Sequence, residues 1–103
     1  MKKHNHQSSV GPALKFARQA QGLTQEAFDV KSSRVYISAV ERGIKTPTLS
    51  AVDKFSAVLG LHPLTLLTLC YLNEVEHSST RDVDELLSAV RDELVRLIPH
   101  QID

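Results

Sequence analysis

The fold is decided by the stretch Leu23-Thr24-Gln25-Glu26-Ala27-Phe28-Asp29-Val30-Lys31-Ser32-Ser33-Arg34-Val35-Tyr36-Ile37-Ser38-Ala39-Val40-Glu41-Arg42-Gly43. Thr24 is a good N-cap for a short helix. Ser32 or Ser33 can cap a second helix over roughly 34–42, and Gly43 is placed as its C-terminal glycine. The stretch therefore predicts two short helices separated by a tight polar turn.

The second of these helices has two different faces. Ile37 and Val40 are spaced to point into a core, which leaves the other face free for the major groove of DNA. The residues expected on this outer face are small or polar and include two arginines: Arg34, Val35, Ser38, Ala39 and Arg42. Such a face meets base edges and phosphates without steric conflict, although each residue can equally be an ordinary exposed one.

The remaining pattern predicts an all-α chain, because no segment alternates with period two. A helix is expected from Gly11-Pro12 to about Gln21, another from Leu49 to Leu59 with Leu49 on its apolar face, and a Leu-rich one after His62-Pro63. The predicted organisation is a flexible arm (1–9), a helix-turn-helix DNA-binding domain (10–73), a linker (74–80), a C-terminal amphipathic helix (81–98) and a tail (99–103).

Composition narrows the class of protein. With 103 residues, 42% of them apolar, the chain fits one small domain. A single cysteine, Cys70, excludes a disulfide framework within one chain and favours a reducing compartment. No run of about 18 apolar residues is present, so a cytoplasmic protein with no membrane partner is expected.

The net charge of zero hides an asymmetry along the chain. Residues 1–22 carry four bases and no acid, residues 23–60 carry five bases and four acids, and residues 61–103 carry three bases and eight acids. The first sixty residues are therefore basic and the rest acidic. This pattern indicates an anionic partner for the N-terminal part, unless it is simply a solvated surface with uneven charge.

These features together resemble the Cro/repressor-type (XRE-like) helix-turn-helix family over about residues 11–72. The resemblance rests on Leu14-Lys15, Arg18, Gly22 to Glu26, Tyr36-Ile37-Ser38, Glu41-Arg42-Gly43, Pro47-Thr48-Leu49 and Leu59-Gly60. It implies a five-helix DNA-binding domain, usually a dimer on an operator with two-fold symmetry. It also implies a structural ion pair between Arg18 and Glu41, and a phosphate contact from Gln25.

The chain departs from the family pattern in the turn. Asp29 stands where the family carries Ala, and the following segment, 30–33, is about two residues short and has no Gly. We expect either that the first helix of the motif loses part of a turn or that the loop is tighter. Either outcome can shift the start of the recognition helix.

The expected contacts with double-stranded DNA come from the motif and the loop after it. They are Gln25, Ser33, Arg34, Val35, Ser38, Ala39, Arg42, Lys45 and Thr46. No catalytic residue is expected, because no nucleophile motif or glycine-rich phosphate loop is present. No metal site or cofactor is expected either: His4 and His6 in the arm lack a full ligand set.

The C-terminal helix has an apolar stripe in which Val83, Val90 and Leu97 repeat every seven residues, as do Leu87 and Leu94. The helix can either fold back on its own domain or pair with its copy. Pairing is favoured, because a DNA reader with two-fold symmetry needs a dimer. The expected dimer interface is apolar and includes the preceding Leu-rich helix: Leu66, Leu69, Leu72, Val83, Leu87, Val90, Leu94 and Leu97. The predicted function is a sequence-specific transcriptional regulator, a repressor acting as a homodimer. The alternative is an antitoxin or other protein-interaction module whose C-terminal helix binds a partner protein.

Overall fold

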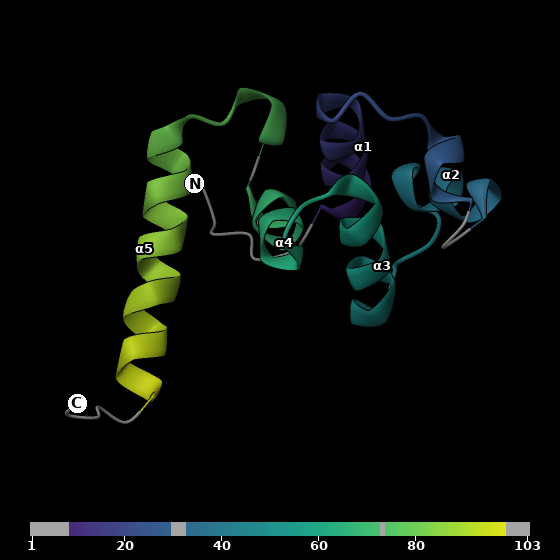
Figure 1. Cartoon of the computed structure of the whole chain (residues 1–103). Helices are drawn as coiled ribbons and strands as arrows, with labels where there is room; N and C mark the ends of the chain where they lie inside the picture. Colours follow the sequence, from purple (N-terminus) through teal and green to yellow (C-terminus); the bar gives the residue numbers. More distant parts are fainter. Residues whose placement is uncertain (1–8, 30–32, 73, 99–103) are drawn as a thin grey trace.

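The computed structural model describes residues 9–29, 33–72 and 74–98, and within these ranges all regular structure is helical. The α-helices are α1 (Val10–Ala20), α2 (Arg34–Glu41), α3 (Leu49–Leu59), α4 (Pro63–Tyr71) and α5 (Thr80–Leu97), and the 3-10 helices are η1 (Gln25–Phe28) and η2 (Val75–His77) (Figure 1). The predicted all-α class is confirmed. The expected arm before Ser9 and the expected tail, 99–103, lie outside the described residues.

Capping residues set the helix boundaries. The hydroxyls of Ser33 and Thr48 accept hydrogen bonds, at 3.0 and 3.1 Å, from the backbone amide three residues further on. His62 Nδ1 accepts from the amide of Leu64 at 3.0 Å. Each bond satisfies an amide that a helix leaves unpaired at its first turn. Of the two expected caps for α2, Ser33 takes the role, and Ser32 lies outside the described residues.

The first helix of the motif is a single 3-10 turn, η1, and Thr24 makes no side-chain cap bond to it. This agrees with the expectation that this helix is shortened. The turn still places Phe28 in the core, where its ring meets that of Phe55 edge to face, with centroids 6.0 Å apart. The shortened helix therefore retains its core contact.

The core lies between α1, η1, α2, α3 and α4. Its buried cluster consists of Leu14, Ala17, Phe28, Ile37, Val40, Val52, Phe55, Leu59 and Leu66. Burying each of the larger side chains contributes about 1.5–3 kcal/mol. Two residues expected in a dimer interface belong to the interior of one chain instead, because Leu66 is 0% and Leu72 6% exposed. That part of the interface prediction is wrong, since the Leu-rich helix packs on α1 and α3.

Gly11 allows α1 to approach the end of α2 closely. A Cβ atom at Gly11 would lie 2.7 Å from the carbonyl oxygen of Glu41 and 2.8 Å from that of Val40. Both distances are too short for a side chain. A residue without a Cβ atom is therefore needed here for the observed placement of α2 against α1.

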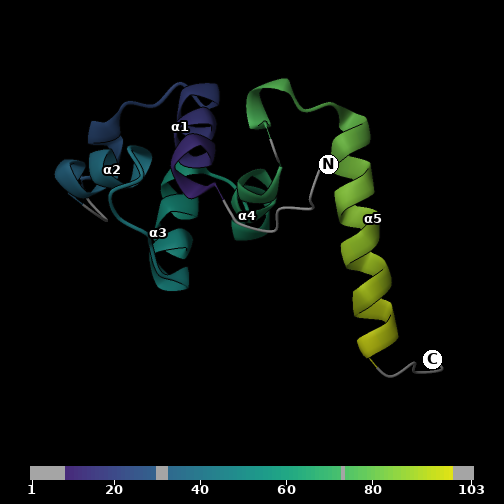
Figure 2. The same ribbon diagram turned by 180° about the vertical axis from the view of Figure 1, so that it is seen from behind.

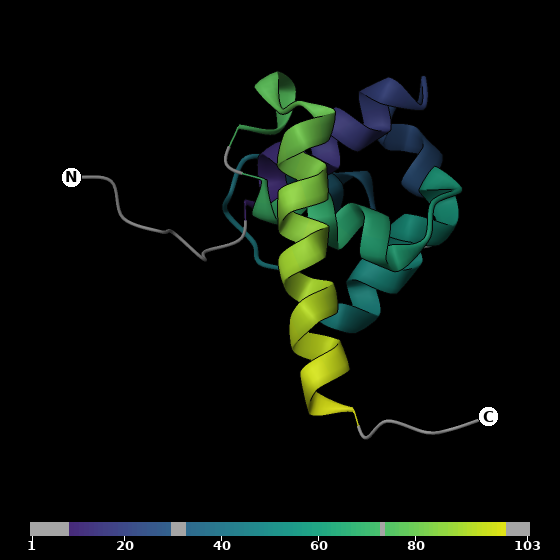
Figure 3. The ribbon, with the colours of Figure 1, turned by 90° about the vertical axis from the view of Figure 1, so that its left-hand side faces the viewer.

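α5 stands apart from this core and contains no buried residue. Figures 1 and 2 show it at the opposite end of the molecule from α2, and Figure 3 shows its C-terminal half extending beyond the other helices. Its main contacts are with α4. Among the described helices, none has the length and apolar character needed to cross a membrane.

Candidate nucleic-acid interface

The outer face of α2 is the candidate DNA-reading surface. Ser33, Arg34 and Arg42 are exposed, Ser38 is half-buried, and Val35 is 77% exposed. The opposite face of the same helix buries Ile37 and Val40 completely or nearly so. The hydrophobic contacts of one face thus fix the helix and present the other to solvent.

Ala39 does not belong to this surface. It was expected on the outer face, but it is only 8% exposed, so this placement is wrong. The chain after Gly43 folds back over the end of α2, where the amides of Ile44 and Lys45 donate to the Ala39 carbonyl at 2.8 and 3.3 Å. These bonds pair a carbonyl that the end of the helix would otherwise leave without a partner.

The two arginines of α2 make different local contacts. Arg34 Nη1 lies 2.7 Å from Oε2 of Glu26, and this ion pair links η1 to the first turn of α2. Both side chains are more than half exposed. Arg42 Nε donates to the carbonyl oxygen and the hydroxyl of Ser38, at 3.3 and 3.2 Å. Arg42 and Ser38 therefore form one polar unit on the outer face.

A buried ion pair holds α2 against α1. Arg18 donates from Nε and Nη2 to the two carboxylate oxygens of Glu41, at 2.7 and 3.0 Å, in the bidentate geometry that favours this pairing. A third bond runs from Arg18 Nη1 to the carbonyl of Leu23 at 2.9 Å. The side chains are 11% and 5% exposed. The hydrogen bonds that Arg18 donates to Glu41 raise the pKa of Arg18 above its ordinary value.

Gln25 takes part in the same network. Its Nε2 donates to Oε1 of Glu41 at 3.0 Å, so one amide hydrogen points inward rather than into solvent. Sequence reasoning placed Gln25 near a phosphate and missed this contact. No signal in the sequence indicates it, since the two residues are 16 positions apart.

The loop after α2 adds exposed side chains of mixed character. Lys45 and Thr46 are exposed, in agreement with their proposed role. Two apolar neighbours, Ile44 and Leu49, are also exposed, by 61% and 71%. Leu49 was expected in the core and is not, because it is the first residue of α3 and Val52 and Phe55 of that helix fill the interior. Ile44 and Leu49 extend the candidate surface beyond the residues that the sequence indicated.

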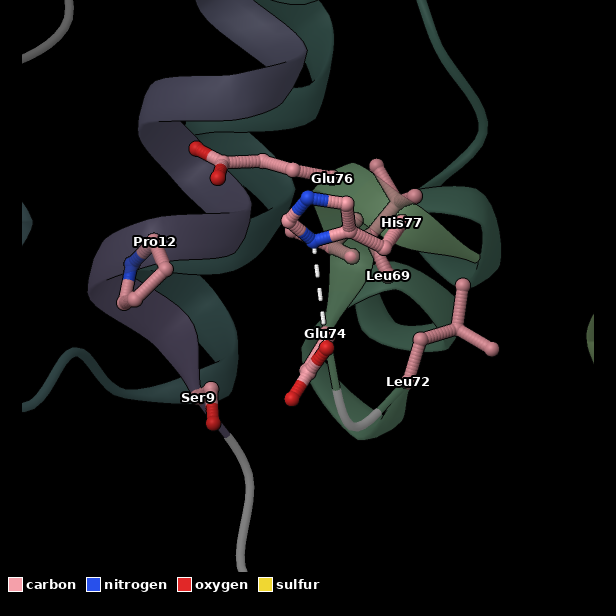
Figure 4. A pocket seen from close by; sticks show the side chains of 8 residues that line it. Ser9, Pro12, Leu69, Leu72, Glu74, Glu76 and His77 are labelled. Carbon is pink, nitrogen blue, oxygen red and sulfur yellow. Dashed lines mark ion pairs between the residues drawn. The ribbon is translucent and has the colours of Figure 1, made fainter. Parts of the chain in front are cut away.

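Two cavities lie away from α2. One, of about 490 Å³, lies between the start of α1, α4 and η2. Glu74 and His77 at its rim are 3.8 Å apart and both largely exposed, and Figure 4 shows the side chains that line it. The other, of about 370 Å³, is a groove between α4 and α5.

No group of three potential metal ligands was found in the described part of the chain. Burial raises the pKa of the Cys70 thiol to about 11, so this thiol stays protonated near neutral pH.

Comparison with known proteins agrees with this geometry. The family described as Helix-turn-helix matches residues 14–66. An uncharacterized HTH-type transcriptional regulator, y4dJ, from Sinorhizobium fredii is 34% identical over 61 residues, which cover 57% of this chain and 79% of that protein. Control protein C.BamHI from Bacillus amyloliquefaciens is 36% identical over 56 residues, 52% of this chain and 69% of that protein. No solved structure gave a significant match. The chain belongs to the XRE-type helix-turn-helix family of DNA-binding transcriptional regulators.

Proposed function

We propose that this chain is a sequence-specific repressor that acts as a homodimer on an operator with two-fold symmetry. The observation that carries the proposal is the outer face of α2, where two arginines and an exposed valine stand on a helix fixed by a buried ion pair. In this proposal residues 10–73 form the DNA-binding domain and residues 81–98 the dimerisation helix. A rigid, exposed recognition helix is what reading the major groove requires.

The proposed contacts divide into base reading and positioning. Arg34 and Val35, at the start of α2, reach base edges, where an arginine can bind guanine bidentately and a valine can touch a thymine methyl. Ser33 and Ser38 add polar contacts, and Arg42 reaches the backbone. Lys45, Thr46 and Gln25 hold phosphates and fix the register of the helix. The basic character of residues 1–60 supports the N-terminal part of the chain as the part that meets DNA.

Repression is the proposed direction of regulation. A dimer that occupies an operator excludes other proteins from the same DNA, and this needs no surface beyond the DNA interface. One relative is named a control protein, which supports a role in controlling expression. Two-fold symmetry in the operator follows from two-fold symmetry in the protein.

The test begins with selection of bound duplexes from a random pool by the full chain, followed by titration of selected and scrambled duplexes. Arg34→Ala should weaken specific binding by about 1–3 kcal/mol, which is roughly 5- to 150-fold. Arg81→Ala, which removes an exposed arginine from α5, is the matched control and should change little. Selected duplexes without a common motif would disprove sequence specificity. Equal affinities for Arg34→Ala and the unchanged chain would disprove the placement of α2.

A second candidate function comes from the apolar residues on α5. Leu87, Val90, Leu94 and Leu97 are 41–73% exposed, at the end of the molecule far from α2 (Figure 1). A protein partner can bind there without covering the DNA interface, as in an antitoxin that masks a toxin. Sedimentation separates the candidates: a full chain that is monomeric at micromolar concentration favours a different partner over a second copy.

A further inference from the structure

We infer that a second copy of this chain lays its α5 antiparallel along α5 and fills the groove between α4 and α5. The inference rests on the homodimer proposed above and specifies how the two copies meet. The groove, of about 370 Å³, is lined by Leu64 and Leu69 of α4 and by Val83 and Leu87 of α5. It continues into the exposed apolar row of α5, so groove and row form one surface.

The apolar row follows a seven-residue repeat. Leu87 and Leu94 occupy its first position, conventionally a, and Val83, Val90 and Leu97 occupy the fourth, d. Side chains at these two positions form the seam of a two-helix coiled coil. Leu87, Val90, Leu94 and Leu97 are exposed, whereas Val83 is half-buried beside α4 at the groove. The seam is therefore open to a partner helix along most of its length.

The order of leucine and valine argues against a parallel pair. Parallel two-stranded coils favour a β-branched residue at a and leucine at d, whereas this helix has leucine at a and valine at two of the three d positions. In an antiparallel pair, a faces d. Leu87 then packs against the partner's Val90 and Val83 against the partner's Leu94, so these layers combine one leucine with one valine.

The charges beside the seam favour the same orientation. Asp84 and Arg91 both occupy the position after d on one flank of the seam. The antiparallel register places Asp84 beside the partner's Arg91, and symmetry repeats the pair. In a parallel pair Asp84 would lie beside the partner's Ser79 and Arg91 beside the partner's Leu86, so neither would meet an opposite charge.

The two halves of α5 differ in net charge, and the difference supports the antiparallel orientation. Residues 80–88 contain one base and three acids, whereas residues 89–97 contain two of each. Antiparallel pairing keeps the acidic halves apart, and parallel pairing would bring them together. α5 lies at the far end from α2, so a copy bound here leaves both recognition helices uncovered (Figures 1 and 2).

Disulfide cross-linking of the full chain tests the orientation directly. Val83→Cys and Leu94→Cys are made separately, and the native Cys70 is buried and does not compete. The antiparallel register predicts that a mixture of the two variants oxidises to a cross-linked dimer, and that neither variant alone does so. In a parallel pair each variant would cross-link by itself, because each new cysteine would face the same cysteine in its copy. A dimer of the two different variants would then not cross-link.

Charge exchange provides a second test that leaves the apolar seam unchanged. Asp84→Arg and Arg91→Asp should each weaken the dimer by roughly tenfold, because each places two like-charged pairs beside the seam. The double variant Asp84→Arg, Arg91→Asp should recover the affinity, and mixing the two single variants should give a heterodimer. Glu85→Arg and Arg96→Asp, which reverse charges away from the seam, are the matched controls and should change the dimer little. Sedimentation equilibrium measures the dissociation constant of each dimer.

The outcomes separate this inference from the homodimer itself. A full chain that remains monomeric overturns both. A dimer in which Leu94→Cys cross-links alone, or in which Asp84→Arg and Arg91→Asp fail to rescue each other, keeps the homodimer and overturns the antiparallel arrangement.

Discussion

Gln25 donates a hydrogen bond from Nε2 to Oε1 of Glu41, at 3.0 Å, and thereby ties the first residue of η1 to the last residue of α2. The same oxygen accepts from Nη2 of Arg18, also at 3.0 Å. One nearly buried carboxylate therefore connects α1, η1 and α2. The relative placement of the two halves of the motif depends on this connection.

Replacing Gln25 by Ala should affect both stability and DNA binding. Loss of the bond to a charged, nearly buried acceptor should lower the free energy of unfolding by about 1.5–3 kcal/mol. If Gln25 also holds a phosphate through its second amide hydrogen, affinity should fall evenly for selected and scrambled duplexes. Urea denaturation and DNA titration measure the two effects. An unchanged free energy of unfolding would show that the bond to Glu41 contributes nothing in solution.

Replacing Arg18 by Ala should destabilise the fold by about 3–5 kcal/mol, because the Glu41 carboxylate would stay buried without its cation. The double variant Arg18→Ala, Glu41→Ala should cost less than the two single variants together, because no unpaired charge remains. Urea denaturation of the four proteins gives the coupling energy. Arg81→Ala, at an exposed ion pair, is the control and should lie within about 1 kcal/mol of the unchanged chain. Additive effects of Arg18 and Glu41 would contradict the pairing.

Local signals made most of the helices predictable. Ser33, Thr48 and Gly60 act within one turn of the chain, so their effect on a boundary can be read from the neighbouring sequence. Leu49 shows the limit of periodicity, because it continues the apolar spacing of α3 yet lies outside the packed part of that helix. Burial at a helix end depends on which other elements reach it, and spacing within one helix carries no information about that.

The candidate site was predictable to a similar extent. Helical periodicity alone predicted that Arg34, Val35 and Arg42 lie on the outer face of α2, and all three are exposed. The prediction for Ala39 failed because this residue is only 8% exposed in the folded chain, and spacing within one helix does not show how far neighbouring elements cover its edge. The Gln25 contact could not be found because it needs the tertiary approach of η1 to α2. Contacts between distant segments therefore remained beyond the reach of sequence patterns.

Gly11→Ala should destabilise the fold and weaken DNA binding together. The added Cβ would lie 2.7 Å from the Glu41 carbonyl, so α1 and α2 must move apart. Overpacking of this kind costs about 1–3 kcal/mol. Gln19→Ala, an exposed change on the same helix, is the control. A variant that melts and binds DNA as the unchanged chain does would show that this close approach does not position α2.

Alkaline pH should destabilise the chain through Cys70. Burial raises the pKa of this thiol from 9.0 to about 11 in the folded chain, so the unfolded chain loses the proton first. The contribution to stability is therefore complete below pH 9 and is lost as pH rises from 9 towards 11, up to about 3 kcal/mol. The difference in free energy of unfolding between Cys70→Ala and the unchanged chain should follow this curve in urea denaturation. A difference that is constant between pH 8 and 11 would contradict the raised pKa.

Glu26→Gln should strengthen binding to every DNA sequence by about two- to fivefold. The Glu26 carboxylate holds Arg34 at 2.7 Å and places a negative charge beside the proposed path of the phosphates. Stability should change by less than about 1 kcal/mol, because both side chains are exposed. Glu76→Gln, an exposed acid on η2, is the control and should leave affinity unchanged. Titrations in the Arg34→Ala background then separate the causes: a gain that disappears comes from release of Arg34, and a gain that persists comes from removal of the charge alone. An unchanged affinity for Glu26→Gln would place the start of α2 away from DNA.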